Sequence, residues 1–331
     1  MAQTIEKIIA SKKPRRRIQG IAAAVLPYEE DGSIAVEAFQ QHLVATQESG
    51  LLNAVNMDTG YVNYLTRDEK REVLSWARAA LGSEVPFVAG AFIENETGDL
   101  VELYRREMDA ITSVGGIPIM FQTERLQGKS TAEKALVYQL ASRDYPQVLA
   151  FELSPRFAPN GNMFDEEMFR RLLDTPAITG MKHSSLDRML ELERLRVRDQ
   201  HRPEFRIYTG NDLAIDMIEY GSDYLLGLAT FAPEKFAERD RLWEAGDARY
   251  WALSDALQYL GNIAFRDPVP AYKASAAVFL HLLGRIPTAR SHPKNPSRPE
   301  WEREMLADCA RRLGLQPTPY LQPAAEVAKD S

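Results

Sequence analysis

One stretch decides how the chain is interpreted: Ala177-Ile178-Thr179-Gly180-Met181-Lys182-His183-Ser184-Ser185. Ala177, Ile178 and Met181 are typical of a strand in a parallel sheet, which is buried on both faces and therefore apolar along its length. Lys182 ends the apolar run, and small polar residues follow it directly. The pattern predicts a buried parallel strand that presents one lysine at its carboxyl end.

A lysine at such a position is a candidate nucleophile. Apolar walls disfavour the ammonium form and lower the pKa of the amine. A pKa lowered from ~10.4 to ~7 corresponds to about 4–5 kcal/mol against the charged state. The neutral amine attacks a ketone and forms a Schiff base. The structural alternative is that Lys182 forms an ion pair with a neighbouring carboxylate.

Outward from this stretch, apolar runs of strand length alternate with segments of helical period. The predicted strands are residues 18–26, 51–57, 86–92, 117–121, 148–153, the lysine strand, 205–209 and 224–228. The predicted helices are residues 34–49, 66–81, 98–114, 131–142, 166–173, one from 186, 213–220 and 233–246. This alternation predicts an α/β fold of the (β/α)₈ TIM-barrel type with a C-terminal helical extension. An open doubly wound sheet is the alternative, but no Gly-x-Gly-x-x-Gly turn follows the first strand.

The predicted organisation has four parts. Residues 1–17 form an N-terminal arm, 18–246 the barrel, 247–315 a C-terminal helical domain, and 316–331 a flexible tail with several prolines. The helical domain is expected to hold helices over 252–263, 272–283 and 301–313, with a proline-rich loop over 286–299.

Composition limits the classes of function. The chain has 331 residues, 45% of them hydrophobic and 26% charged, with a net charge of −7 and a single cysteine, Cys309. An acidic chain without an apolar run of membrane length argues against nucleic-acid and membrane partners. One cysteine and no secretory signal pattern predict a cytoplasmic protein. The basic run over residues 12–17 is expected to be a solvated arm, with a nucleic-acid or targeting patch as the alternative.

Catalytic groups of such barrels lie at the carboxyl ends of the strands. Besides Lys182-His183, the predicted ends offer Asp58-Thr59-Gly60, Glu94, Gln122, Glu152 and Gly210-Asn211-Asp212. His183 adjoins Lys182 on a strand, so its side chain is expected to point away from the barrel axis.

Five stretches resemble the family of dihydrodipicolinate synthase and N-acetylneuraminate lyase. Ile178-Thr179-Gly180-Met181-Lys182 resembles the Ile-x-Gly-Ile-Lys stretch that carries the Schiff-base lysine of the family. Asp58-Thr59-Gly60-Tyr61, with the following residues 65–69, is similar to the family's Gly-Thr-Thr-Gly-Glu followed by Leu-Thr/Ser-x-x-Glu. Residues 208–212 (YTGND), 227–233 (GLATFAP) and 267–273 (DPVPAYK) are similar to Ser-Gly-Asp/Glu-Asp, Gly-x-Ala-Asn-x-Ala-Pro and Asn-Pro-Ile-Pro-x-Lys.

The resemblance covers roughly residues 18–315 and implies a class I aldolase or lyase without an external cofactor. It implies Lys182 as the Schiff-base lysine and a homotetramer or homodimer as the assembly. The substrate-binding residues that we expect are Thr59, Gly60, Phe151, Arg156, Gly210, Asn211 and Leu226. Arg156 falls where the family keeps an arginine for the substrate carboxylate, a role that suits its forked donors.

The departures from the family pattern concern proton transfer. The family relays protons through a tyrosine on the fifth strand, and Phe151 occupies the matching position. Asp58 replaces the first threonine of the Thr-Thr pair. We therefore expect Asp58 to act as general acid/base, with Tyr61 or Tyr64 as alternative sources of a phenol.

The predicted function is a Schiff-base-forming lyase, aldolase or dehydratase acting on a 2-oxo acid. Polar residues at the strand ends suit a sugar-derived keto acid. One alternative is a lyase or isomerase that binds Mg²⁺ or Mn²⁺ through Asp58, Glu94 and Glu152. The other is a catalytically silent barrel that binds a ligand, which the missing strand-five tyrosine favours.

Overall fold

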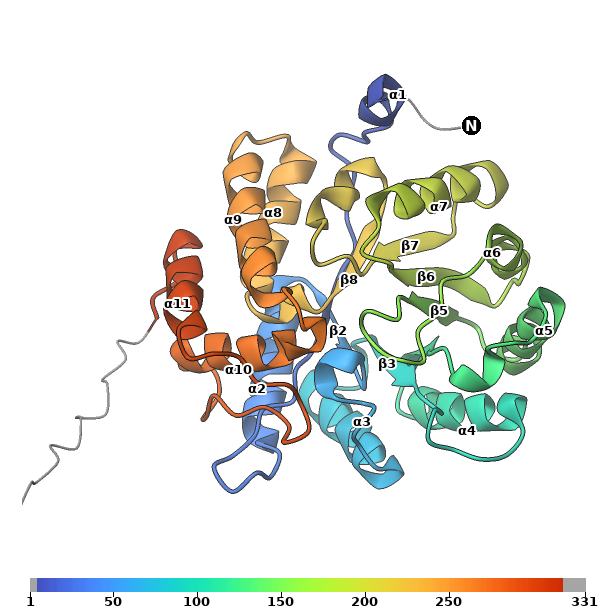
Figure 1. Cartoon of the computed structure of the whole chain (residues 1–331), viewed down its shortest axis with the longest axis horizontal. Coiled ribbons are helices and arrows are strands. Elements are labelled where there is room, and N and C mark those ends of the chain that lie inside the picture. The colour runs from blue at the N-terminus through green and yellow to red at the C-terminus, as the bar shows by residue number, and fades with distance from the viewer. Residues whose placement is uncertain (1–4, 318–331) are drawn as a thin grey trace, which may run out of the picture.

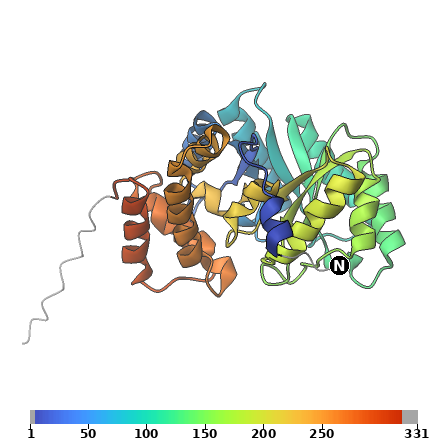
Figure 2. The same ribbon diagram turned by 90° about the horizontal axis from the view of Figure 1, so that it is seen from above.

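The computed structural model describes residues 5–317. Eight parallel strands form a closed barrel in the order of the sequence, with β8 pairing back onto β1 (Figures 1 and 2). The strands are β1 (Gly20–Ala23), β2 (Leu52–Val55), β3 (Phe87–Ala91), β4 (Gly116–Met120), β5 (Val148–Leu153), β6 (Ile178–Ser184), β7 (Arg206–Thr209) and β8 (Asp223–Leu226). The closed order confirms the predicted fold class and excludes the open doubly wound sheet.

Helices cover the outside of the barrel (Figure 1). They are α2 (Val36–Ser49), α3 (Arg67–Leu81), α4 (Leu100–Ser113), α5 (Thr131–Ser142), α6 (Glu166–Leu173), α7 (Arg188–His201) and α8 (Pro233–Ala245). The segment between β7 and β8 differs from the prediction, because Ile215–Tyr220 is a 3₁₀ helix, η3, rather than an α-helix. Helix α3 begins with a capping box: the Thr66 hydroxyl accepts from the Glu69 amide, and the Glu69 carboxylate accepts from the Thr66 amide.

The register of the central strands determines which side chains face the interior. Phe151 pairs with Lys182, and Lys182 pairs with Tyr208; in the next row Glu152 pairs with His183. Successive residues of a strand point to opposite faces of the sheet. Phe151 and Lys182 therefore share the inner face of the barrel, while Glu152 and His183 share the outer face under the helices.

The C-terminal extension contains α9 (Arg249–Ala264), α10 (Tyr272–Leu282) and α11 (Glu302–Arg312), preceded at α10 by the 3₁₀ turn η5 (Val269–Ala271). Helix α9 packs on α8, and α11 packs on α9 and α10. The loop from α10 to α11 brings His292 against the rings of Tyr61 and Tyr64 near the mouth of the barrel. The extension therefore supplies part of the rim around the lysine strand.

The N-terminal arm is attached to the barrel instead of extending into solvent, and it begins with a short helix, α1 (Ile5–Ala10). Lys12, Lys13 and Arg16 form ion pairs with Glu219, Asp199 and Asp223 at 2.5, 2.6 and 2.8 Å. Three basic side chains of the run are thus paired with carboxylates of the barrel. This pairing disfavours the interpretation of the run as a nucleic-acid patch. Most of the predicted tail, residues 318–331, lies outside the described residues.

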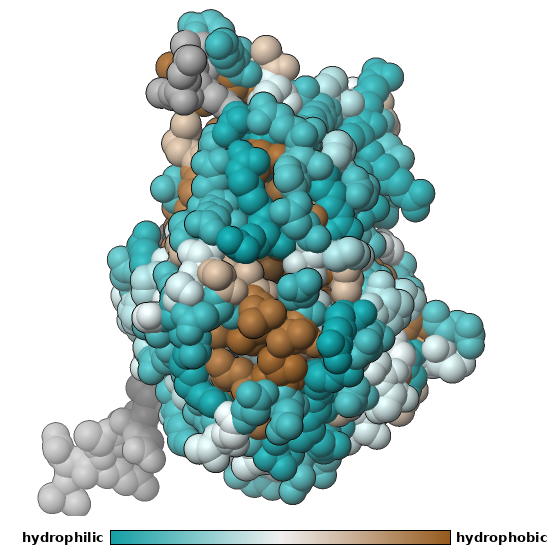
Figure 3. All heavy atoms as spheres, turned by 90° about the vertical axis from the view of Figure 1, so that its right-hand side faces the viewer, coloured by the Kyte–Doolittle hydropathy of each residue, from teal (hydrophilic) through white to brown (hydrophobic). Residues whose placement is uncertain are grey.

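The outer wall on the side of α5 and α6 is hydrophilic around one compact apolar patch (Figure 3). Leu136 on α5 is among the large apolar side chains that remain exposed on the protein.

Within residues 5–317, the helices are too short or too polar to cross a membrane. The predicted homo-oligomer stays a prediction.

Candidate active site

Lys182 lies on the inner face of β6 and is 7% exposed. Its Nζ lies 4.5 Å from the centroid of the Phe151 ring. Burial lowers the pKa of the amine to about 8, although the fields of Asp212 and Asp58 partly oppose this shift. Within residues 5–317, Nζ makes no hydrogen bond or ion pair. The structure therefore does not show the ion pair between Lys182 and a carboxylate that was the alternative to a nucleophilic lysine.

Gly210, directly after β7, leaves the space that the lysine side chain occupies. A Cβ atom at this position would lie 2.7 Å from Lys182 Cε and 2.0 Å from Ser184 Oγ. Both distances are far below van der Waals contact, so any larger residue displaces the lysine or the serine. Gly210 is therefore required for the position of the amine.

Gly210→Ala is expected to slow imine formation by Lys182 about 10- to 100-fold, since a shift of about 1 Å in a reacting group has an effect of that order. The methyl group also overpacks a buried site, so we expect a loss of stability of about 1–3 kcal/mol and a folded protein with a lowered melting temperature. The rate of borohydride-dependent labelling, measured beside a melting curve, checks this. Wild-type labelling kinetics would show that Gly210 does not position the amine.

A second group of polar side chains connects the end of β2 to the start of α10. The Tyr272 hydroxyl lies 2.8 Å from Thr59 Oγ1 and 3.0 Å from Asp58 Oδ2. Lys273 Nζ pairs with Asp58 Oδ1 at 3.2 Å, and its side chain is 2% exposed. Asp58 is thus an ion-paired carboxylate that accepts a phenol hydrogen bond.

Asp212 is a functional candidate that the sequence analysis noted only as a polar strand-end residue. Burial raises the pKa of its carboxyl to about 7, against the hydrogen bond from the Leu228 amide and the field of Lys182. Its Oδ1 accepts from Leu228 N at 2.7 Å. A carboxyl group that exchanges protons near neutrality, within the field of the amine, is suited to acid–base chemistry.

The two tyrosines proposed as phenol sources lie elsewhere. Tyr61 is fully buried against Tyr28 and His292, and among the described residues its hydroxyl has no hydrogen-bond partner. The Tyr64 ring stacks on His292, and its hydroxyl donates to the Lys294 carbonyl. Neither hydroxyl contacts Asp58, whereas Tyr272, which the prediction missed, does.

His183 points away from the barrel axis, as predicted. Its Nδ1 lies 2.5 Å from Glu152 Oε1, and its Nε2 lies 2.7 Å from Ser185 Oγ. Arg194 of α7 donates to both Glu152 oxygens, at 3.0 and 3.2 Å. Burial alone would raise the pKa of Glu152, but His183 and Arg194 lower it to about 2. Glu152 is therefore a structural anion on the outer face of the barrel, which corrects its interpretation as a polar group at the mouth.

The three carboxylates of the metal-ion alternative have separate partners. Glu152 binds His183 and Arg194, Asp58 binds Lys273, and Glu94 accepts from the Glu124 amide. Within residues 5–317, no three His, Cys, Asp or Glu side chains are grouped so as to hold a metal ion. The donor set predicted for Mg²⁺ or Mn²⁺ is therefore not assembled.

The remaining predicted substrate residues are distributed around the mouth of the barrel. Arg156 is half-exposed and pairs with Asp267 at 3.6 Å, so it reaches the rim formed by the C-terminal extension. Leu226 and Gly60 are buried at the ends of β8 and β2. The Asn211 amide group bonds to Leu186 N and Glu191 Oε2, which commits it to the loop after β6.

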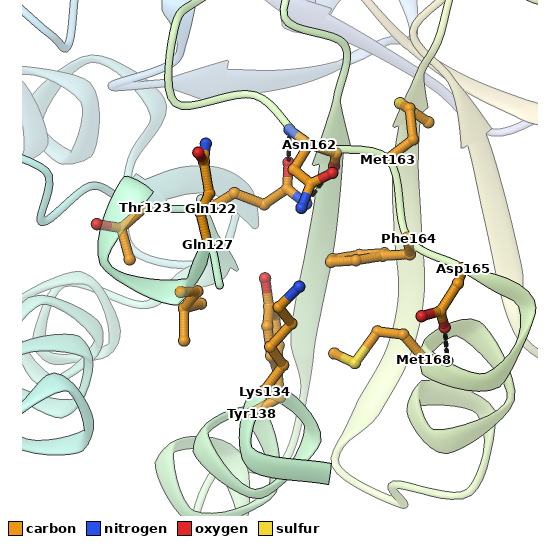
Figure 4. A pocket seen from close by; sticks show the side chains of 11 residues that line it. Gln122, Thr123, Gln127, Lys134, Tyr138, Asn162, Met163, Phe164, Asp165 and Met168 are labelled. Carbon is orange, nitrogen blue, oxygen red and sulfur yellow. Dashed lines mark hydrogen bonds between the residues drawn. The ribbon is translucent and has the colours of Figure 1, made fainter. Parts of the chain in front are cut away.

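A cavity of about 190 Å³ lies outside the barrel, between the ends of β4 and β5 and helices α5 and α6 (Figure 4). Gln122, Lys134, Tyr138 and Phe164 are among its lining residues, and Lys182 is not. Gln122 Oε1 accepts from the amides of Leu153 and Asn162, at 3.1 Å each. Gln122 therefore anchors the loop after β5, and this cavity is separate from the lysine.

Comparisons with known proteins find relatives in sequence and in fold. No family model matches the chain. The 4-hydroxy-tetrahydrodipicolinate synthase of Kosmotoga olearia is 25% identical over 224 residues, which is 66% of this chain and 74% of the relative. An uncharacterized DapA-like lyase of Thermococcus kodakarensis is 25% identical over 250 residues, 74% of this chain and 80% of the relative.

Solved structures share the fold. Dihydrodipicolinate synthase from Thermotoga maritima superposes with a TM-score of 0.75 at 17% identity, covering 90% of this chain and 99% of the other. The chloride-inhibited Acinetobacter baumannii enzyme, complexed with pyruvate, gives 0.75 at 18% identity, covering 91% and 100%. The barrel and the matches to these proteins support the class of aldolase-type lyases. The chain is similar in sequence to curated members of the dihydrodipicolinate synthase family and shares the fold of their solved structures, with the departures at Asp58 and Phe151 described above.

Proposed function

We propose that this protein is a Schiff-base-forming lyase that acts on a 2-oxo acid, with Lys182 as the nucleophile. The observation that carries the proposal is a buried amine with a pKa of about 8 and no ion partner among the described residues. The amine attacks the ketone carbon, water leaves, and the resulting iminium accepts electrons when a bond at the adjacent carbons breaks. Pyruvate bound to the Acinetobacter relative supports a 2-oxo acid as the substrate class.

Residues around Lys182 have separate roles in this proposal. Phe151 and Gly210 shape the space beside the amine. Asp212 supplies the proton with which the carbinolamine hydroxyl leaves as water, and it recovers that proton when the imine is hydrolysed. Arg156 exchanges Asp267 for the substrate carboxylate, which its planar donors bind in a bidentate manner. Thr59, Gly60 and Leu226 line the opposite side of the barrel mouth.

The test is a panel of 2-keto-3-deoxy sugar acids, with release of pyruvate or loss of the substrate ketone followed after treatment with EDTA. EDTA-resistant turnover by the wild-type protein, lost in Lys182→Met, supports the proposal. Turnover that EDTA abolishes would favour the metal-dependent alternative. Complete inactivity on the panel, together with no covalent adduct, would favour a silent binding barrel.

The rate of imine formation is expected to follow a bell-shaped pH profile with its maximum between about 7 and about 8. The rate rises as Lys182 loses its proton near its pKa of about 8, and it falls as Asp212 loses the proton it donates near its pKa of about 7. In Asp212→Asn the decline of the rate at alkaline pH should disappear, while the rise of the rate with deprotonation of Lys182 should remain. Initial rates of borohydride labelling at constant ionic strength provide the measurement. A profile that keeps rising towards pH ~10 would mean an unperturbed lysine.

A further inference from the structure

The barrel lacks a strand-five phenol, and we propose that Tyr272 of the C-terminal extension replaces it as the proton-transferring residue of the Schiff-base reaction. This inference rests on the proposed function of Lys182. Tyr272 is the first residue of α10, roughly ninety residues after Lys182, and 3% of its surface is exposed. Tyr272 directly precedes Lys273 in the stretch DPVPAYK (267–273), which leads from η5 into α10.

The Tyr272 hydroxyl is the central member of a short hydrogen-bonded chain. Thr59 Oγ1 lies on one side at 2.8 Å, and Asp58 Oδ2 lies on the other at 3.0 Å. The Asp58 side chain is 16% exposed and therefore connects the chain to solvent. A hydroxyl, a phenol and a carboxylate in sequence provide donors and acceptors through which a proton moves.

The Tyr272 ring is held in place by its surroundings. It stacks on Phe265 with ring centroids 4.3 Å apart and an interplanar angle of 15°. Lys273, the next residue, fixes the far oxygen of Asp58. At Gly227, directly after β8, a Cβ atom would lie 2.9 Å from Tyr272 Cε2 and 3.2 Å from Thr59 Oγ1. Gly227 thus leaves room for the phenol and hydroxyl, as Gly210 does for the lysine.

Tyr272 and Lys182 lie within the electrostatic influence of the same two carboxylates. The charges of Asp58 and Asp212 act on the Lys182 amine and on the Tyr272 phenol alike. Burial and these charges hold the pKa of Tyr272 far above its ordinary value, so the phenol enters the reaction protonated. A protonated phenol donates to an oxyanion and requires a proton in return.

The proton balance in the addition step is simple. When the neutral amine of Lys182 bonds to the ketone carbon, the nitrogen becomes positive and the former carbonyl oxygen becomes an alkoxide. Tyr272 gives its phenolic proton to the alkoxide and regains one from the nitrogen through the Thr59 hydroxyl. The step yields a neutral carbinolamine and leaves the phenol unchanged, with no co-reactant.

The experiment compares Tyr272→Phe with Tyr104→Phe, since Tyr104 is a buried tyrosine whose hydroxyl donates to the Phe121 carbonyl on the outside of the barrel. Wild type and variants are mixed with pyruvate and, separately, with 2-keto-3-deoxygluconate in the presence of cyanoborohydride, and labelling of Lys182 is followed by mass spectrometry. We expect Tyr272→Phe to label Lys182 about 10²- to 10⁴-fold more slowly, the usual contribution of a positioned acid–base group. Tyr104→Phe should label at the wild-type rate.

Gly227→Ala is the second variant, because it keeps the phenol and displaces it; slower labelling at an unchanged melting temperature supports the inference if Tyr272→Phe does not fold. Equal rates for Tyr272→Phe and Tyr104→Phe, with Lys182 labelled in both, would overturn the role of Tyr272 and leave the proposed function intact. A wild-type protein that labels no lysine would overturn both.

Discussion

Lys182→Met is expected to abolish covalent capture of 2-oxo acids and to reduce turnover by at least about 10³-fold, because no other amine replaces the nucleophile. The same substitution should stabilise the folded protein at neutral pH. The pKa of Lys182 falls from 10.5 to about 8 on burial, which corresponds to about 3 kcal/mol against folding when the amine is charged. A lowered lysine pKa means that the unfolded chain binds the proton more tightly. Wild-type stability therefore rises as the pH increases from about 8 to about 10.5, and Lys182→Met should lose this dependence.

Lys273→Met is the matched control, since Lys273 is also a buried lysine but is paired with Asp58 at 3.2 Å. Its loss leaves a carboxylate without its cation and should lower stability, while Lys182 remains available for labelling. Chemical denaturation at neutral and alkaline pH, beside adduct formation, separates the two lysines. A Lys182→Met protein less stable than wild type at pH 7 would argue that the amine is neutralised by a partner.

Arg194→Met should destabilise the protein by about 3–5 kcal/mol, the usual cost of removing one partner from a buried ion pair. The side chains of Arg194 and Glu152 are 2% and 0% exposed, and the Arg194 guanidinium also donates to the Phe164 carbonyl. His183 would then be the remaining side-chain partner of Glu152 within the wall of the barrel. Because Glu152 and His183 adjoin Phe151 and Lys182 on their strands, labelling of Lys182 should also slow.

The control for this variant is Arg170→Met, which removes an ion pair with Glu166 at 2.7 Å on the exposed surface of α6. Exposed pairs of this kind contribute little, so the melting temperature should stay near that of wild type. Urea denaturation of the two variants measures the difference. Equal stabilities would show that the cluster around Glu152 does not hold the wall together.

The barrel and its lysine were predictable because both depend on local pattern. Apolar strand-length runs such as residues 148–153 alternate with capped helices, and α3 begins and ends where the Thr66 capping box and Gly82 place it. The burial of Lys182 at the end of a strand was predictable from the apolar composition of that strand. The outward direction of His183 follows from the two-residue period of a strand. Applied to the pair Phe151 and Glu152, the same rule would have placed Glu152 outside.

The proton-handling residues could not be predicted because they depend on contacts between distant segments. Lys273 and Asp58 are separated by 215 positions in the sequence, and Tyr272 meets Thr59 across 213. Only the docking of α10 onto the mouth of the barrel brings these side chains together. Tyr61 follows Asp58 by only three positions, but its ring packs against Tyr28 and His292. For Asp212, burial rather than residue type determines the acid–base character.

Peptide mapping of the wild-type protein after incubation with pyruvate and borohydride shows whether Lys182 is the nucleophile. We expect one reduced adduct per chain, located on Lys182 and formed fastest between pH about 7 and about 8. An adduct on Lys273, or none with any 2-oxo acid of the panel, would contradict this expectation.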